Sequence, residues 1–360
     1  MFLEKLSLIN YKNFEVKNLD FNPKINCITG LNGVGKTNIL DAIYHLAFTK
    51  GYFNNISTQN IQHGKDFFLI EGVFNFKDRL EVVSCGVKTG QKKIVKRNGK
   101  EYDKLSDHIG LIPVVIISPN DTDLIATGSE VRRKFIDGII AQSNKKYLQY
   151  LLQYNKALAQ RNALLKYFAS NHIFDAVNLE IYNEQLVEYG TYIYQQRIEF
   201  VAAFKPLFKE RYKQISKYEE NVSFIYKSRL HETEFKPLLQ NNLKKDRILQ
   251  YTSVGIHKDD LLYTIAGYPI KKYGSQGQQK TYLIALKLAE FDIIKSELHT
   301  TPLLLLDDIF DKLDEKRVKE IVNLVNDRYF GQIFLTDTHT DRTEKVIQQT
   351  AQPYTMINIT

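Results

Sequence analysis

Apolar positions follow two different periods along this chain, and the change of period divides it into three stretches. In residues 67–76 and 80–87 apolar and polar positions alternate and many side chains are aromatic or β-branched, which predicts two antiparallel strands. Shorter apolar runs at 25–28, 113–117 and 303–306 predict buried strands. Strands at both ends of the chain, mixed with helical stretches, indicate an α/β fold.

The middle of the chain has the helical period instead. From about residue 145 to 216 a break occurs only near 170–172, which predicts two antiparallel helices. Apolar residues recur every seven positions on both, a spacing that keeps one seam facing a partner helix. The predicted seam consists of Leu151, Leu158 and Leu165 on the first helix and of Leu179, Leu186, Ile193, Phe200 and Leu207 on the second.

This pattern predicts a head that is interrupted by an arm. Residues 1–140 and 221–360 are expected to form the head with a mixed sheet, and residues 141–220 an inserted helical hairpin, the second lobe. At 1.5 Å per residue the hairpin would be about 40–60 Å long. The second part of the head is expected to include a helix near 315–328 and strands at 332–336 and 354–359.

Composition narrows the class of protein. The chain has 360 residues, of which 25% are charged and 43% apolar, as in water-soluble globular proteins. We find no transmembrane or export segment in the sequence and therefore expect a cytoplasmic protein. The two cysteines, Cys27 and Cys85, have no zinc-site spacing.

The charge favours a polyanionic partner. The net charge is +8 and the isoelectric point about 9.0. Each basic cluster alone is compatible with a solvated face. On an ATPase head of the DNA-repair class, which the motifs below indicate, the clusters together favour a surface that contacts the DNA backbone without reading its sequence. The largest cluster surrounds the turn dipeptide at 98–99 and supplies the DNA-binding candidates Lys92, Lys93, Lys96, Arg97 and Lys100.

Residues 30–37 match the phosphate-binding loop G-x-x-x-x-G-K-[ST] between a predicted strand and a predicted helix. In such a loop the glycines let backbone N–H groups surround phosphates, Lys36 reaches the β- and γ-phosphates, and the Thr37 hydroxyl reaches Mg²⁺. The sequence therefore predicts an ATP site. Its residues are Gly30, Leu31, Asn32, Gly33, Val34, Gly35, Lys36, Thr37 and Asn38.

Two adjacent acids follow the apolar run 303–306. Asp307 is expected to bind the Mg²⁺ of the nucleotide, and Asp308 to activate the attacking water. The alternative is an ordinary core strand followed by two acids that begin a helix. The phosphate loop upstream favours the catalytic interpretation, with Lys36 and Asp308 as catalytic residues.

A polar, glycine-containing segment at 275–279 precedes a helical stretch. Such a helix N-terminus can hold a γ-phosphate, although many helices begin with similar caps. Because it lies between the other two motifs, it resembles the signature of ABC-type ATPases, which completes the nucleotide site of a second subunit. The resemblance implies an ATP-dependent homodimer, with residues 310–314 at its interface. The residues acting in trans would be Ser275, Gln276, Gly277, Gln278 and Gln279.

The spacing of the motifs narrows the family. Asp307 lies 271 residues after Lys36, much farther than in the nucleotide-binding subunits of transporters. The chain further resembles, in order, the sequence blocks of the RecF family of bacterial recombination mediators. The matching blocks are 3–14, 33–43, 117–121, 132–137 and 255–261.

The resemblance to RecF implies an SMC-like head that dimerises on ATP, binds DNA beside single-stranded gaps, and recruits RecR- and RecO-like mediator proteins. Two alternatives are the energy subunit of a membrane transporter and a nuclease-associated ATPase of the overcoming-lysogenization-defect type. The long motif spacing and the arm oppose the first. The lack of a further acidic nuclease domain opposes the second.

Three positions depart from the general ABC pattern. Ser118–Asp121, including Asn120, stands where a water-sensing glutamine is usual, and the γ-phosphate histidine is missing from its strand end, with His339 a few residues beyond. Asp308 is one methylene shorter than the usual glutamate. Because these enzymes gain rate by positioning water, the departures predict slow hydrolysis.

His257 has two interpretations. The resemblance places its loop near nucleotide or dimer contacts, whereas the local pattern predicts a simple turn before a strand. A metal site with Asp259 and Asp260 is less favoured, because Mg²⁺ has better ligands in Thr37 and Asp307.

Overall fold

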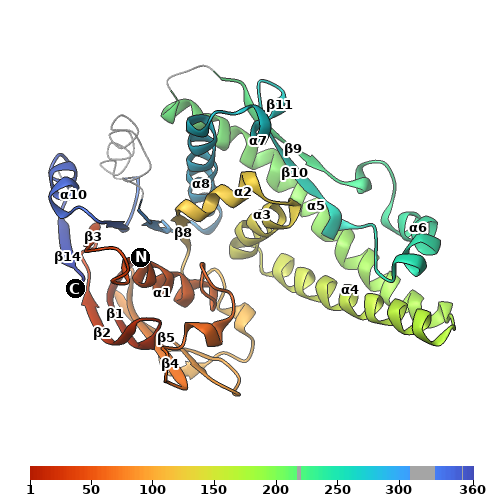
Figure 1. Ribbon diagram of the computed structural model, residues 1–360, viewed down its shortest axis with the longest axis horizontal. Helices are drawn as coiled ribbons and strands as arrows, with labels where there is room; N and C mark the ends of the chain where they lie inside the picture. Colours follow the sequence, from red (N-terminus) through yellow and green to blue (C-terminus); the bar gives the residue numbers. More distant parts are fainter. Residues whose placement is uncertain (217–219, 309–328, 351) are drawn as a thin grey trace. The chain divides into compact units, whose positions relative to one another are not determined.

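The chain forms two compact units in the computed structural model (Figure 1). The first joins both ends of the chain, residues 1–121 and 290–360, and the second contains residues 122–289. The structure describes residues 1–216, 220–308, 329–350 and 352–360. The predicted helix near 315–328 and the predicted interface segment 310–314 lie outside the described residues.

A five-stranded parallel sheet organises the first unit. Four of its strands are buried at every position, which explains the uninterrupted apolar runs at 114–117 and 303–306. The other two buried strands, at 25–29 and 333–337, also contain polar residues. Because all five strands are parallel, their carboxyl ends lie at one edge of the sheet. The order is β14 (Tyr354–Asn358), β3 (Ile25–Thr29), β13 (Ile333–Asp337), β12 (Leu303–Leu306) and β8 (Val114–Ile117).

A six-stranded antiparallel sheet completes the first unit. The strands predicted at 67–76 and 80–87 are confirmed and pair along their whole length. Parallel and antiparallel pairing thus occur in separate sheets of the α/β head. The order is β2 (Phe14–Asp20), β1 (Phe2–Tyr11), β4 (Phe67–Phe76), β5 (Arg79–Lys88), β6 (Ile94–Arg97) and β7 (Lys100–Glu101).

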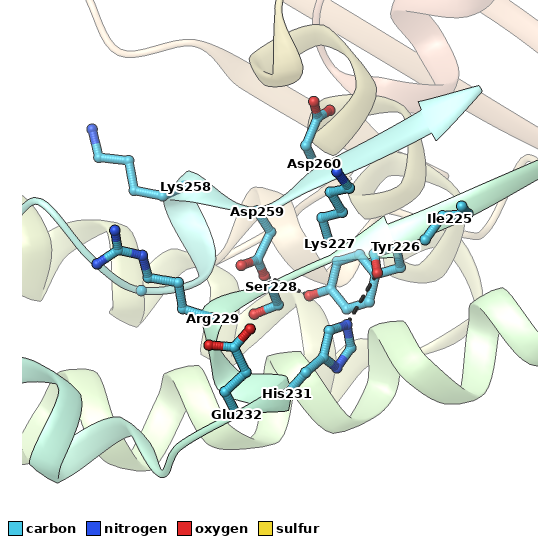
Figure 2. A pocket seen from close by; sticks show the side chains of 11 residues that line it. Ile225, Tyr226, Lys227, Ser228, Arg229, His231, Glu232, Lys258, Asp259 and Asp260 are labelled. Carbon is cyan, nitrogen blue, oxygen red and sulfur yellow. Dashed lines mark hydrogen bonds between the residues drawn. The ribbon is translucent and has the colours of Figure 1, made fainter. Parts of the chain in front are cut away.

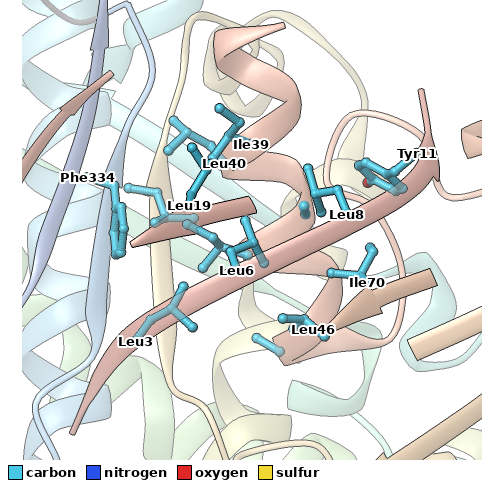
Figure 3. Close-up of a cluster of buried hydrophobic side chains, with 14 of the residues drawn as sticks. Leu3, Leu6, Leu8, Tyr11, Leu19, Ile39, Leu40, Leu46, Ile70 and Phe334 are labelled. Carbon is cyan, nitrogen blue, oxygen red and sulfur yellow. The ribbon is translucent and has the colours of Figure 1, made fainter. Parts of the chain in front are cut away.

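One hydrophobic cluster joins both sheets to helix α1 (Lys36–Phe48). Figure 3 shows Leu6 and Leu8 of β1, Ile39 of α1 and Phe334 of β13 in this cluster. This packing fixes the start of α1, where the phosphate loop ends. A second helix, α10 (Thr340–Ile347), follows β13.

The second unit contains the two predicted arm helices. Figure 1 shows α4 (Lys145–Asn171) and α5 (Ala176–Ile215) side by side, with α6 (Phe235–Leu249) beside their far end. A three-stranded antiparallel sheet packs against α5. The remaining elements are α2 (Asp123–Ala126), α3 (Ser129–Ser143), β9 (Val222–Lys227), β10 (Asp260–Ile265), β11 (Tyr268–Pro269), α7 (Ile270–Tyr273) and the start of α8 (Gln276–Leu298).

Short 3₁₀ turns link these elements. They are η1 (Ser57–Asn60), η2 (Leu105–Asp107), η3 (Pro119–Thr122), η4 (Arg229–His231) and η5 (Ile256–Lys258). The second unit is larger than the arm expected at 141–220, because α3, α6 and the small sheet pack onto the arm helices rather than belonging to the head.

The predicted seam on α4 is correct only at its last position. Leu165 is buried as predicted, but Leu151 and Leu158 are only partly buried. The fully buried positions include Tyr147, Tyr154 and Arg161, which are again seven apart but lie one helical turn before the predicted leucines, so the centre of the buried stripe is shifted. The buried Arg161 is neutralised by an ion pair of 2.8 Å to a buried aspartate of α6. An apolar repeat cannot reveal a seam that contains a buried arginine. The sequence therefore predicted the repeat of leucines instead.

The predicted seam on α5 is correct over its first part. Leu179, Leu186 and Ile193 are completely buried, and Phe200 lies at the same face. Farther along, Leu207 is only partly buried and its neighbour Phe208 is buried instead. The change of face follows from a change of partner, because this end of α5 packs against the aromatic side chains of β9.

Candidate nucleotide and magnesium site

The loop between β3 and α1 has a backbone that requires glycine. Gly30 and Gly35 have φ values of 150° and 108°. A Cβ atom at Gly35 would lie 2.5 Å from the Asn13 side chain and 2.7 Å from the Phe14 ring, and one at Gly30 would lie 2.3 Å from the carbonyl oxygen of Ile359. The glycines of the motif therefore allow the loop to curve close to its own supporting residues.

Lys36 lies inside this loop. Its side chain is only 5% exposed, and its ammonium group donates to the carbonyl oxygens of Gly30 and Leu31 at 2.8 and 2.9 Å. The amine is thus held at the centre of the curved loop, where a phosphate group cradled by the loop would meet it. The donor set fits a polyphosphate.

Thr37 and Asp307 come together although 270 positions separate them. The Thr37 hydroxyl donates to Asp307 Oδ1 at 2.9 Å, and the Thr336 hydroxyl donates to the same oxygen at 2.9 Å. Burial raises the pKa of Asp307, although both hydroxyls oppose the shift. A hydroxyl and a carboxylate at a buried sheet edge form the kind of oxygen site that Mg²⁺ prefers.

Asp308 immediately follows Asp307 and turns away from the strand. Its φ of 44° lies in the left-handed region, which aspartate tolerates better than most residues. Its backbone N–H donates to the Thr336 hydroxyl at 2.9 Å. The Thr336 hydroxyl therefore contacts both acids of the motif: it donates to the side chain of Asp307 and accepts from the main chain of Asp308.

Asn13 supports the phosphate loop, a role that the sequence gave no reason to expect. Its side-chain amide donates to the carbonyl oxygen of Val34 at 2.7 Å, and its Oδ1 accepts from the Asn38 side chain at 2.8 Å. The β1–β2 turn is thereby tied to both sides of the loop. The only local signal was a short polar turn between two strands.

The predicted signature segment, residues 275–279, lies at the start of helix α8. The Ser275 N–H donates to Gln278 Oε1 at 2.7 Å, and the Gln278 N–H donates to Ser275 Oγ at 3.2 Å. These reciprocal bonds form a capping box. Ser275 and Gln276 are exposed, while Gln279 donates to the carbonyl oxygen of Gly274 at 3.0 Å.

The predicted signature residues and the phosphate loop belong to different units of the chain. Gly277 is partly buried, and its carbonyl oxygen accepts from the Thr281 hydroxyl at 3.0 Å. The exposed serine at a helix N-terminus is compatible with a role toward a ligand outside its own unit.

Local contacts hold the residues that stand where ABC-type ATPases usually have the water-sensing glutamine and the γ-phosphate histidine. Asp121 accepts from the Ser118 N–H at 2.7 Å and from the Tyr52 hydroxyl, so its carboxylate organises the turn after β8. Asn120 is exposed. His339 is exposed as well and precedes α10.

The basic cluster at 92–100 divides into two groups. Lys93 is half-buried, and its amine donates to the Thr49 carbonyl oxygen and to Ser57 Oγ at 3.2 Å; burial lowers its pKa. Arg97 forms a bidentate ion pair with Glu81. The exposed members are Lys92, Lys96 and Lys100.

His257 has the contacts of a structural residue. Its Nε2 lies 2.9 Å from the Thr252 carbonyl oxygen and its Nδ1 lies 2.8 Å from the Tyr154 hydroxyl. Asp260, the possible metal ligand nearby, pairs with Arg132 at 2.8 Å. Among the residues that the structure describes, no group of three or more His, Cys, Asp or Glu could hold a metal ion. These contacts favour the interpretation of this loop as a turn.

A pocket of about 590 Å³ opens next to this loop in the second unit (Figure 2). Figure 2 shows the Tyr226 hydroxyl directed at Asp259, a bond of 2.5 Å. Asp259 is buried, which raises its pKa, and it pairs with the buried Arg197 at 3.2 Å. The buried carboxylate in the pocket wall is thus used to join α5 to the η5 turn.

Residues 2–356 match a family model described as the RecF/RecN/SMC N terminal domain. The DNA replication and repair protein RecF of Flavobacterium johnsoniae is 56% identical over 100% of both chains. That of Phocaeicola vulgatus is 48% identical over 98% of this chain and 95% of its own. The chain belongs to the RecF family.

Solved structures agree with this assignment to the RecF family. The structure described as the recombination mediator protein RecF-ATP in the RecFOR pathway has a TM-score of 0.88 at 31% identity, covering 94% of this chain and 92% of that chain. An Smc head domain from Pyrococcus furiosus, at 18% identity and a TM-score of 0.57, shares the fold over 100% of this chain and 94% of its own. No helix among the described residues is long and apolar enough to cross a membrane.

Proposed function

We propose that this RecF-family chain is an ATP-switched DNA-binding protein of recombinational repair and replication-gap repair. One observation carries the proposal: Thr37 and Asp307, from motifs at opposite ends of the chain, meet at 2.9 Å beside the buried amine of Lys36. The relatives described as RecF, one of them with ATP, support the same assignment.

The nucleotide would occupy the loop 30–38, with Lys36 at its β- and γ-phosphates and Mg²⁺ held by Thr37 and Asp307. Bound there, Mg²⁺ would neutralise charge on the phosphates during hydrolysis. Asp308 would hold the attacking water. The departures at Asn120 and His339 favour slow turnover, which suits a switch better than a motor.

The switch would act by dimerisation. The exposed Ser275 of one subunit would complete the site on the other, so that each ATP lies between two chains. The exposed Lys92, Lys96 and Lys100 would contact phosphates of DNA in a way independent of its sequence, because nothing in the cluster is shaped to read base edges. RecR- and RecO-like mediator proteins would be the partners of the DNA-bound state in the cytoplasm.

DNA binding with and without ATP tests this function. A fluorescent gapped duplex should bind wild type tightly with ATP and Mg²⁺ and weakly without nucleotide, and Lys36→Ala should behave in both cases like nucleotide-free wild type. Equal DNA affinity with and without ATP would contradict the proposal. Lys65→Ala is the matched control, because Lys65 is an exposed lysine of the same unit that pairs with an exposed glutamate.

A further inference from the structure

Exposed apolar side chains are concentrated at the far end of the arm. Of the 18 large apolar side chains that are exposed among the described residues, eight belong to two short segments, 167–181 and 248–251. Val177 and Ile248 are 77% and 80% exposed. The others are Tyr167, Ile173, Phe174, Ile181, Leu249 and Tyr251.

The two segments are neighbours in the fold. The guanidinium carbon of Arg247 lies 4.1 Å from the centre of the Phe174 ring, and Leu243 packs on the buried cluster of Leu165 and Phe168. Figure 1 shows the end of α6 beside the α4–α5 turn. The exposed side chains therefore form one surface, which we call the arm-tip surface and define as residues 164–181 and 243–251.

The arm-tip surface is preformed. The α4–α5 turn is closed by the Ile173 N–H, which donates to the Phe168 carbonyl oxygen at 3.1 Å, and by Asp175, which accepts from the Asn178 N–H at 3.0 Å. Phe174 packs edge-on against Phe168 at 5.5 Å. Binding of a partner here would cost little conformational entropy of this chain, because the surface is already ordered.

The rim of this surface is basic. Its exposed cations are Lys166, Lys244, Lys245 and Arg247. Its three carboxylates are engaged within the unit: Asp175 caps α5, Asp246 is buried against Arg161, and Glu180 lies 3.8 Å from Lys236. The uncompensated charge is positive.

We infer that the arm-tip surface binds a partner protein through a segment that presents apolar side chains within an acidic rim. Tyrosine, phenylalanine and arginine around aliphatic side chains are the composition of a protein interface. A DNA backbone offers nothing to the exposed aliphatic side chains. A second copy of the same surface would bring its cations against their equivalents.

Two synthetic amphipathic helical peptides with identical leucine and phenylalanine positions test the inference. One carries glutamate at its polar positions and the other lysine, and binding to the full chain is followed by fluorescence anisotropy. The acidic peptide should bind and the basic one should bind at least about tenfold more weakly. The double variant Lys244→Ala, Lys245→Ala should bind the acidic peptide more weakly, and this binding should depend less on salt.

The double variant Val177→Ser, Ile248→Ser should bind the acidic peptide at least about tenfold more weakly than wild type, since two exposed apolar contacts are lost. Leu80→Ser, a change of a 60% exposed leucine in the other unit, is the matched control and should have no effect. Lys36→Ala should bind the peptide normally, so this inference can fail or hold independently of the nucleotide switch.

Several results would overturn the inference. These are equal binding of both peptides, no binding of the acidic peptide up to about 1 mM, or wild-type affinity in the serine variant. If wild type bound phosphatidylglycerol vesicles and the serine variant did not, the surface would be assigned to a membrane. The same result with duplex DNA would assign it to DNA. If wild type self-associated and the serine variant did not, the surface would be assigned to a second copy of the chain.

Discussion

At the scale of single residues, Lys36 is the side chain whose replacement is most informative. Lys36→Ala should weaken ATP binding at least about 100-fold, because it removes charge-assisted hydrogen bonds to the phosphates that contribute roughly 1.5–3 kcal/mol each. Isothermal titration calorimetry measures this directly. Wild-type ATP affinity in Lys36→Ala, with Lys65→Ala also unchanged, would show that the loop is not the nucleotide site.

His257 supplies a pH test of its structural role. Burial is the main reason why the pKa of His257 is lowered to about 4, and the nearby charges of Lys258 and Arg133 lower it as well. The hydrogen bond to Thr252 and the charge of Asp246 act in the opposite direction and raise the pKa. The neutral ring is therefore favoured by folding, and the stability it contributes is fully present above pH 6.5 and is lost as the pH falls toward 4.

Between pH 7 and pH 5 this single group should remove about 2 kcal/mol from the free energy of unfolding of the second unit. His257→Gln should retain both hydrogen bonds without titrating and should lose this part of the pH dependence. Urea unfolding of both proteins at the two pH values measures the difference. An identical pH dependence in His257→Gln and wild type would contradict the assigned environment.

Thr37 and Asp307, which the sequence assigned to one site, meet at 2.9 Å, because the motifs encode local backbone geometry and strand ends that a parallel sheet brings to one edge. The sequence could not predict Asn13. The contact of that side chain with the loop depends on how the β1–β2 turn folds back, which no local pattern specifies.

At the scale of elements, helix α8 begins in the second unit, ends in the first, and has the predicted signature at its exposed start. Ser275→Arg should leave ATP binding nearly unchanged and abolish dimerisation and hydrolysis, because the serine would act on the nucleotide of the other subunit. Ser275→Thr keeps the helix cap and a hydroxyl and is the matched control.

Mixing Ser275→Arg and Lys36→Ala subunits gives the sharper experiment. Each mixed dimer has one site with both changes and one with neither, so part of the hydrolysis should return on mixing. If no activity returned, independent composite sites would be the wrong model.

The arm illustrates what element-level patterns reveal and what they miss. Helix positions and lengths follow from the helical period, and the first half of the α5 seam follows from its heptads. The α4 seam was predicted correctly only at Leu165, because the seam also contains the buried Arg161, which is compensated by Asp246, 85 residues away in the sequence. Buried charge pairs of this kind are determined by tertiary contacts alone.

At the scale of the whole molecule, DNA binding should depend steeply on salt. With roughly 5–8 phosphates contacted, the log–log slope against salt concentration should be about −4 to −7. Replacing Lys92, Lys96 and Lys100 by alanine should weaken binding to unrelated duplexes alike and flatten the slope by up to about 1 for each true contact.

Lys93→Met is the control for this series, because the Lys93 amine is engaged with Thr49 and Ser57. It should lower the melting temperature and leave the salt slope unchanged. A wild-type affinity and slope in the triple alanine variant would move the DNA surface elsewhere.

Sedimentation velocity of wild type and Asp308→Asn, with and without ATP and Mg²⁺, tests the ATP switch most directly. Both proteins should be monomers without nucleotide. With ATP, both should sediment as dimers, and the Asp308→Asn dimer should persist longer because its loss of the carboxylate slows hydrolysis. Monomers in both proteins at saturating ATP would contradict the central claim that ATP closes two of these chains around their shared sites.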